Sequence, residues 1–267
     1  MAFTHRSLAA LGLFALGAQP IIHLALASHT KNTPLLTKEQ VQILSHMSIV
    51  QLPDGQGGLR KTLRLTGINV QIVNGLGATN GHRLDPTTTD PLLSSTNGVG
   101  NLIIGYDDLP RNPTAPLDRT GSHNLVVGFG HNYSSFGGQV VAYENTTSAA
   151  YAVVSGGGAN TASAEFATVS GGINNRASGA DSSVSGGFQN RATGFVSSVS
   201  GGTLNLASAQ FSSVSGGQGN VASGDSSTVS GGGFNSAGGF ISTVGGGSSR
   251  TNTGSFDWNA GSLFEDF

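Results

Sequence analysis

The sequence predicts an all-β fold, a parallel β-solenoid, and two observations support this prediction. The tetrapeptide Val-Ser-Gly-Gly recurs every 15 residues through the C-terminal half of the chain. The composition combines 42 glycines in 267 residues with only 10% charged residues. Few large side chains remain for a globular core, and the charge is too low for a typical disordered chain. A 15-residue unit with a fixed β-branched residue fits one solenoid coil and no helical repeat.

Three columns of like residues define each coil. We expect the valine of each repeat to point inward between two outward hydroxyl residues, because side chains alternate along a strand. The alanines should form a second interior column, and the asparagines a hydrogen-bonded ladder at a turn. The valines are Val154, Val169, Val184, Val199, Val214, Val229 and Val244. The alanines are Ala162, Ala177, Ala192, Ala207, Ala222 and Ala237. The asparagines are Asn160, Asn175, Asn190, Asn205, Asn220 and Asn235.

The seventh repeat departs from this pattern. Arg250 and Asn252 stand where its asparagine and alanine would be. We therefore expect the regular β-roll repeats to span residues 154–250, with residues 251–267 as a C-terminal cap. Phe256, Trp258 and the apolar residues near Phe267 would cover the open end of the rod, as solenoids require.

The thinness of each coil predicts a homo-oligomer. One buried valine contributes only ~1.5–3 kcal/mol, whereas ordering each residue costs ~1.5 kcal/mol. Neighbouring chains could supply the missing burial, because the Gly-Gly face lets backbones approach closely. The row twelve residues after each valine mixes bulky and polar residues, such as Phe166 and Asp181. We expect it to be half-exposed and covered by a neighbouring chain or a loop.

The repeat resembles the head repeats of trimeric autotransporter adhesins, the YadA-like or Hep-Hag type. The matching string is Ser183-Val184-Ser185-Gly186-Gly187, followed by Asn190, Ala192 and Gly194. The resemblance implies a left-handed parallel β-roll, a trimer around one axis, and binding of host, matrix or cell-surface macromolecules. We expect this chain to lack the coiled-coil stalk and membrane anchor of that family, since Phe267 follows closely on the last repeat.

Residues 1–27 predict an export signal. His5 and Arg6 precede an apolar run, and Ala25-Leu26-Ala27 offers a cleavage site. A buried helix or a membrane anchor is the alternative interpretation. We expect a secreted, extracellular or cell-surface protein whose mature chain contains no integral membrane segment.

Residues 28–100 are expected to form an N-terminal helix and capping strands. The segment Thr37-Lys38-Glu39-Gln40 is a capping box that opens a short helix, which Asp54-Gly55 would end. The alternation from Leu63 to Val73 predicts a strand pair that covers the N-terminal edge of the solenoid.

Residues 101–153 are expected to form degenerate coils with an inserted loop. The segments align when Ile104, Val127 and Val141 are superimposed, at spacings of 23 and 14 residues. The wider spacing leaves a loop at residues 107–119 that projects from the roll. Such loops often carry recognition, although a plain surface excursion is the alternative.

No catalytic residue, cofactor or metal site is predicted, and the chain is not expected to be an enzyme. His123 and His131 each precede an asparagine and could align, but such rows are usually hydrogen-bonding structure. Cysteine is absent, which excludes disulfides and thiolate metal sites. A net charge of −2 gives no electrostatic reason to expect nucleic acid as a partner.

Three functions remain open. The first is an oligomeric structural or adhesin-like protein that binds surfaces or macromolecules or forms fibres. The second is ice binding by rows of hydroxyl groups on one flat face, and the third is an appendage or tail-fibre module. The candidate hydroxyl face consists of Thr168, Ser170, Ser183, Ser185, Ser198, Ser200, Ser213, Ser215, Thr228 and Ser230.

Overall fold

The computed structural model describes residues 36–112 and 116–260. The predicted export signal at residues 1–27 and the last seven residues of the predicted cap lie outside the described residues. The chain divides into two compact units, Met1–Val70 and Gln71–Phe267. Among the described residues, no helix is long and apolar enough to cross a membrane.

The first unit contains the predicted helix, α1 (Lys38–Ser45). Its capping box is formed in both directions, since Gln40 N donates to Thr37 Oγ1 at 3.2 Å and Thr37 N donates to Gln40 Oε1 at 2.8 Å. These two bonds satisfy backbone donors that the first helical turn leaves unpaired. The prediction of a short N-terminal helix is confirmed.

The strands of this unit differ from the prediction. They form an antiparallel hairpin of β1 (Met47–Pro53) and β2 (Leu59–Leu65), and residues 66–73 contain no strand. Asp54-Gly55 begins the hairpin loop of residues 54–58 and does not end the helix. The Asp54 carboxylate accepts hydrogen bonds from Gln56 N and Gly58 N, which fixes the loop. Hairpin loops of three to five residues that contain glycine are common.

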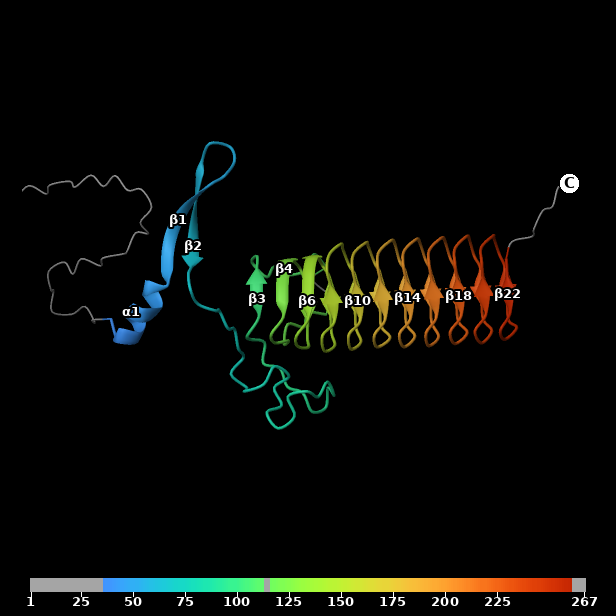
Figure 1. Ribbon diagram of the computed structural model, residues 1–267, viewed down its shortest axis with the longest axis horizontal. Coiled ribbons are helices and arrows are strands. Elements are labelled where there is room, and N and C mark those ends of the chain that lie inside the picture. Colours follow the sequence, from blue (N-terminus) through green and yellow to red (C-terminus); the bar gives the residue numbers. More distant parts are fainter. Residues whose placement is uncertain (1–35, 113–115, 261–267) are drawn as a thin grey trace, which may run out of the picture. The chain divides into compact units, whose positions relative to one another are not determined.

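The second unit is a parallel β-solenoid, which confirms the predicted fold class (Figure 1). Its eleven-stranded sheet, here the valine sheet, pairs the strands of successive coils. Its strands are β3 (Leu102–Ile104), β4 (Leu125–Phe129), β6 (Gln139–Tyr143), β8 (Val153–Val154), β10 (Thr168–Val169), β12 (Ser183–Val184), β14 (Ser198–Val199), β16 (Ser213–Val214), β18 (Thr228–Val229), β20 (Thr243–Val244) and β22 (Trp258–Asn259).

The second sheet has nine strands and is here called the alanine sheet. Its strands are β5 (Asn132–Tyr133), β7 (Thr146–Thr147), β9 (Thr161–Ala162), β11 (Arg176–Ala177), β13 (Arg191–Ala192), β15 (Leu206–Ala207), β17 (Val221–Ala222), β19 (Ser236–Ala237) and β21 (Thr251–Asn252). In both sheets each repeat strand pairs in register with the strand 15 residues later, so identical positions stack.

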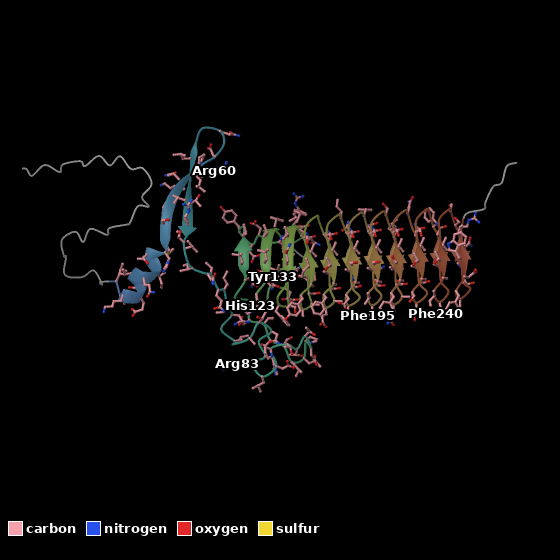
Figure 2. All side chains as sticks on the ribbon, viewed as in Figure 1. Arg60, Arg83, His123, Tyr133, Phe195 and Phe240 are labelled. Atoms are coloured by element: carbon pink, nitrogen blue, oxygen red, sulfur yellow. The ribbon has the colours of Figure 1, made fainter. Side chains whose placement is uncertain are left out.

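Two turns connect the sheets in every coil. The glycine turn runs from the valine to the asparagine, as in residues 185–190, and the aromatic turn runs from the alanine sheet back to the valine sheet, as in residues 193–197. Figure 1 shows the turns aligned along two opposite edges of the solenoid. Phe195 and Phe240 lie along the edge of the aromatic turns (Figure 2).

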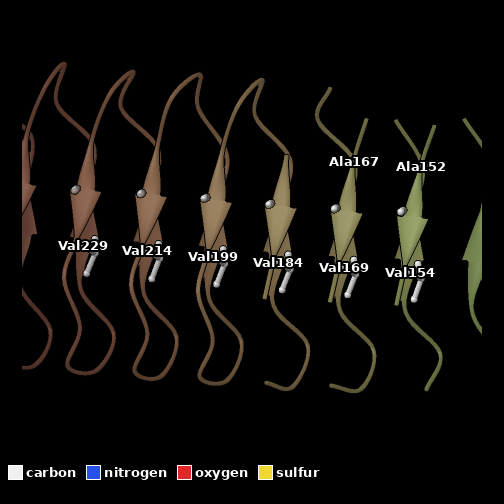
Figure 3. Packing of buried hydrophobic residues seen from close by; sticks show 14 of the residues in the cluster. Ala152, Val154, Ala167, Val169, Val184, Val199, Val214 and Val229 are labelled. Carbon is white, nitrogen blue, oxygen red and sulfur yellow. The ribbon is translucent and has the colours of Figure 1, made fainter. Parts of the chain in front are cut away.

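The predicted interior columns are confirmed. The repeat valines from Val154 to Val244 are 0–1% exposed, and the repeat alanines from Ala162 to Ala237 are 0% exposed. Figure 3 shows the valines stacked one above another, one from each coil. The apolar part of the interior therefore consists of small side chains, and it is continuous along the rod.

The asparagine ladder is also confirmed, and Asn190 represents it. Its Nδ2 donates to Gly186 O in its own coil and to Gly202 O in the next coil, both at 2.9 Å. Its Oδ1 accepts from Asn205 N at 3.0 Å. Asn190 is fully buried, so these three bonds satisfy backbone groups that water cannot reach.

The second glycine of each pair is required by this geometry. Gly187 has a φ of +86°, and a Cβ added to it would lie 2.2 Å from Gly202 O. Both conditions exclude a side chain. The first glycine, Gly186, has no positive φ, and an added Cβ would meet no atom within 4 Å.

One interior column was not predicted. The residue before each outward hydroxyl of the valine sheet is buried, and it is serine in most coils. Ser182, Ser197, Ser227 and Ser242 have hydroxyl groups that are buried and make no hydrogen bond among the described residues. In the same column Ser212 Oγ donates to Ala209 O at 2.7 Å.

The solenoid continues beyond the predicted end at Arg250. Both β21 and β22 pair with the preceding coil, so the last coil closes at Asn259. The asparagine ladder ends with Arg250 N donating to Asn235 Oδ1, and Asn252 fills the alanine column by donating to Thr243 O and Asp257 O. The expected boundary was wrong because backbone pairing continues where the repeat motif is lost.

The degenerate coils align as predicted. Ile104 pairs with Val127, and Val127 pairs with Val141. The valines that continue the interior column are the preceding residues, Val126 and Val140, which are 1% and 0% exposed.

Replacement of a ladder asparagine should be severely destabilising. We expect Asn190→Ala to lower the free energy of unfolding by at least about 3 kcal/mol, because three backbone groups lose their partner in the interior. Thermal or denaturant unfolding measures this. Asn174→Ala is the matched control, since Asn174 is exposed and Ala159 occupies the same position one coil earlier. Equal effects of the two variants would contradict the ladder.

Replacement of a serine whose buried hydroxyl has no hydrogen-bond partner should stabilise the protein. We expect Ser197→Ala to raise the free energy of unfolding by about 1 kcal/mol, because a buried hydroxyl without a partner costs free energy. Ser212→Ala serves as control, since it removes a hydrogen bond and should not stabilise. Stabilisation by both variants, or by neither, would argue against the unpaired state of Ser197.

Candidate interaction surfaces

His123 and His131, which could have aligned, do not align in the structure. His123 follows Ser122, which pairs with Phe136, whereas His131 precedes Asn132, which pairs with Thr146. They therefore lie in different rows of the coil. Among the described residues, no group of three or more histidine and acidic side chains is arranged to hold a metal ion.

His131 instead takes the place of an asparagine in the ladder. Its Nδ1 lies 3.2 Å from Asn145 N, and its Nε2 lies 3.0 Å from Val127 O. Asn160 makes the equivalent two contacts to Asn175 N and Gly156 O. Because Asn145 N is a donor and Val127 O an acceptor, the imidazole must be neutral with its hydrogen on Nε2.

The surroundings of His131 favour this neutral form. The side chain is 1% exposed, and this burial lowers the pKa of His131 below its ordinary value. The positive charge of Arg119 lowers it further, while the hydrogen bond to Val127 O and the negative charge of Asp107 act in the opposite direction.

An ion pair and several hydrogen bonds hold the two ends of the inserted loop beside His131. Arg119 Nη1 and Asp107 Oδ2 are 3.3 Å apart, and the Tyr133 hydroxyl donates to the same oxygen at 2.9 Å. Arg119 Nε also donates to His131 O at 3.1 Å. Burial and the hydrogen bond to Asp107 raise the pKa of Tyr133 to about 12, so its hydroxyl keeps its proton.

The described part of the loop lies against the coils and does not project as expected. Arg111 N donates to Glu144 Oε1 at 2.6 Å, and the Arg111 guanidinium lies 5.4 Å from the centre of the Tyr143 ring. Asp118 N donates to Asn132 Oδ1 on the other side of the loop. Residues 113–115 lie outside the described residues.

The predicted hydroxyl face is present on the outer side of the valine sheet. Its inner row is half-buried and consists of Thr168, Ser183, Ser198, Ser213 and Thr228. Its outer row is exposed and consists of Ser170, Ser185, Ser200, Ser215 and Ser230. Within the inner row Ser198 Oγ lies 3.1 Å from Ser213 Oγ, so neighbouring coils can exchange hydrogen bonds.

The aromatic turns form an exposed ridge. Phe195 packs on Phe211 and Phe240 packs on Phe256, with ring centres 5.8 and 5.3 Å apart, and Tyr151 stacks on Phe166 at 5.3 Å. The row twelve residues after each valine is half-exposed, as expected, since Phe166, Val196, Phe211 and Ile241 are 39–49% exposed. Sequence analysis overlooked Phe195 and Phe240 in the adjacent row. They are 45 residues apart, which is three coils, so both occupy the same position of the repeat, and this shared position was the signal that could have revealed them.

Comparison of the chain with protein-family models found no match. Comparison with curated proteins found no match either.

The stability of the protein should fall at acidic pH because of His131. Its folded pKa lies below the unfolded value of about 6.5. The neutral imidazole therefore contributes stability that is fully present above that value and is lost as the pH falls through the folded pKa. We expect the melting temperature to drop by a few degrees more between pH 7 and pH 5 in the natural protein than in His131→Asn.

The asparagine side chain of His131→Asn makes the same kind of ladder hydrogen bonds as the other coils, and it has no titrating group. Asp85→Asn is the control variant, because the pKa of Asp85 lies below this pH window. Its melting temperature should therefore change between pH 7 and pH 5 as that of the natural protein does. Parallel pH profiles for the natural protein and His131→Asn would refute the role of the imidazole.

Proposed function

We propose that the chain is a secreted or cell-surface structural protein of the adhesin-like type, which assembles into oligomers and binds surfaces or macromolecules through its outer faces. The observation that carries this proposal is the in-register stacking of the coils. Each outward side chain of the valine sheet recurs in the next coil, so one weak contact is repeated along the rod. Repeated contacts to a polymer add up to high avidity.

Two further features support the proposal. The interior of the repeat coils is filled by valine, alanine, serine and asparagine, so the varied chemistry of the rod lies on its outside. The solenoid and its Val-Ser-Gly-Gly, asparagine and alanine positions also agree with the resemblance to YadA-like head repeats, from which we take the trimer, the left-handed coil and the macromolecular partner. The predicted export signal supports an extracellular location.

The hydroxyl face is the surface we assign to binding. It is the most regular outer surface of the rod, and its serine and threonine groups can both donate and accept hydrogen bonds. Glycans and matrix polymers offer matching hydroxyl and amide groups. A flat double row of hydroxyls also favours ice binding as a second candidate, because the rows lie in register from coil to coil.

Binding of the full chain to immobilised matrix proteins, glycans and cells tests the proposal. We expect the triple variant Ser185→Asp, Ser200→Asp and Ser215→Asp to weaken binding at least tenfold, because charge and bulk interrupt the hydroxyl row. The control carries the same substitution at Ser178, Thr193 and Ser208, which are half-buried at the start of the aromatic turns. Thermal hysteresis measured on the same proteins tests ice binding.

Two outcomes would overturn the adhesive proposal. One is the absence of binding to any of these surfaces, and the other is an equal loss in both triple variants. Thermal hysteresis that only the hydroxyl-face variant abolishes would favour the ice-binding alternative.

A further inference from the structure

The charged residues of the repeat coils are separated by sign between the two edges of the solenoid. Between residues 154 and 260, every acidic residue lies in an aromatic turn and every basic residue lies in or directly after a glycine turn. We call the first the acidic edge and the second the basic edge. The acidic edge carries Glu165, Asp181, Asp225 and Asp257, and the basic edge carries Arg176, Arg191 and Arg250.

The basic edge offers a site for a negatively charged partner. Arg176 and Arg191 occupy the same position in neighbouring strands β11 and β13, where like charges disfavour each other. They line an open, shallow part of the surface together with Asn174, Gln189 and Leu204. Neither arginine side chain forms an ion pair within the described residues.

Both edges also expose large apolar side chains. On the basic edge Ile173 and Phe234 are 53% and 59% exposed, and on the acidic edge Phe211 and Phe240 are 49% and 47% exposed. The first glycine of each pair, such as Gly186, presents bare backbone on the basic edge. Contact between the two edges would bury apolar area at both and let the backbones approach closely.

We infer that the basic edge of one copy packs against the acidic edge of a second copy, with the two rods parallel and in register. Arg176 and Asp181 belong to the same coil, so this register places the arginine of one copy opposite the aspartate of the next. Such a contact joins two different patches, so it either closes into a ring or continues as a fibre. This inference rests on the oligomer included in the proposed function.

Antiparallel rods would not give a closed assembly through these edges. A two-fold axis between two copies brings each surface patch against itself, so basic would meet basic. Only rods that point the same way can join unlike edges around a common axis. In the in-register arrangement two of the three arginines, Arg176 and Arg250, share a coil with an acidic residue, Asp181 and Asp257.

Disulfide cross-linking tests this register, because the chain has no cysteine of its own. The single variants Arg176→Cys and Asp181→Cys are purified, mixed under dissociating conditions, reassembled and oxidised. We expect cross-linked pairs in high yield. Asp225→Cys is the matched control, since it lies three coils away, about 14 Å along the rod, and disulfides need Cα atoms within roughly 7 Å.

Charge reversal provides the second measurement. We expect Arg176→Glu with Arg191→Glu to lower the native mass to that of the single chain, and added Asp181→Arg to restore assembly. A natural protein that is itself monomeric would remove the oligomer and this inference together. An oligomer that resists charge reversal, or that cross-links Asp225→Cys as well as Asp181→Cys, would overturn only the edge pairing.

Discussion

The buried asparagine ladder is the interaction on which the rest of the solenoid depends. A glycine turn places backbone N–H and C=O groups in the interior, where an unpaired group costs about 1–3 kcal/mol. One amide supplies two donors and an acceptor at a fixed separation, and Asn190 uses all of them on backbone groups of two coils. Serine has too few donors and an aspartate carboxylate has none. At one coil the imidazole of His131 replaces the amide. It can do so because a neutral imidazole also provides one donor and one acceptor.

This ladder also determines what the rod can bind. The amides, the small alanines and the single valines leave an interior with no room for a substrate, so recognition must use outer rows. Identical positions stack at the spacing of neighbouring strands, so any contact made by one coil is offered again by the next. Affinity can then arise from repetition of weak contacts rather than from one deep site.

The repeat columns could be predicted because the 15-residue period superimposes residues that share one environment. Other features could not. The column of Ser197 and its equivalents was overlooked because a hydroxyl residue next to a turn usually points outward, although the alternation back from Val199 places Ser197 on the inner side. The last coil was missed because Arg250 and Asn252 break the motif while their backbones continue the pairing. The hairpin was misplaced because Asp54-Gly55 was interpreted as the end of a helix, and a single dipeptide does not distinguish the two kinds of turn.

The aromatic turns, which carry the acidic residues of the repeat coils, also contain residues with an unfavourable backbone conformation. Val196 and Ile241 each have a φ of 52°, a region that costs L residues about 1–2 kcal/mol and is rarest for β-branched side chains. In a single rod Val196 and Ile241 are still 39% and 42% exposed, so burial offsets the strain only in part. A second surface that covers the exposed part would offset more of it. The charge that complements the neighbouring carboxylates lies on the opposite edge of the same molecule. Backbone strain, apolar exposure and charge distribution therefore all favour the same partner, a second copy of the chain.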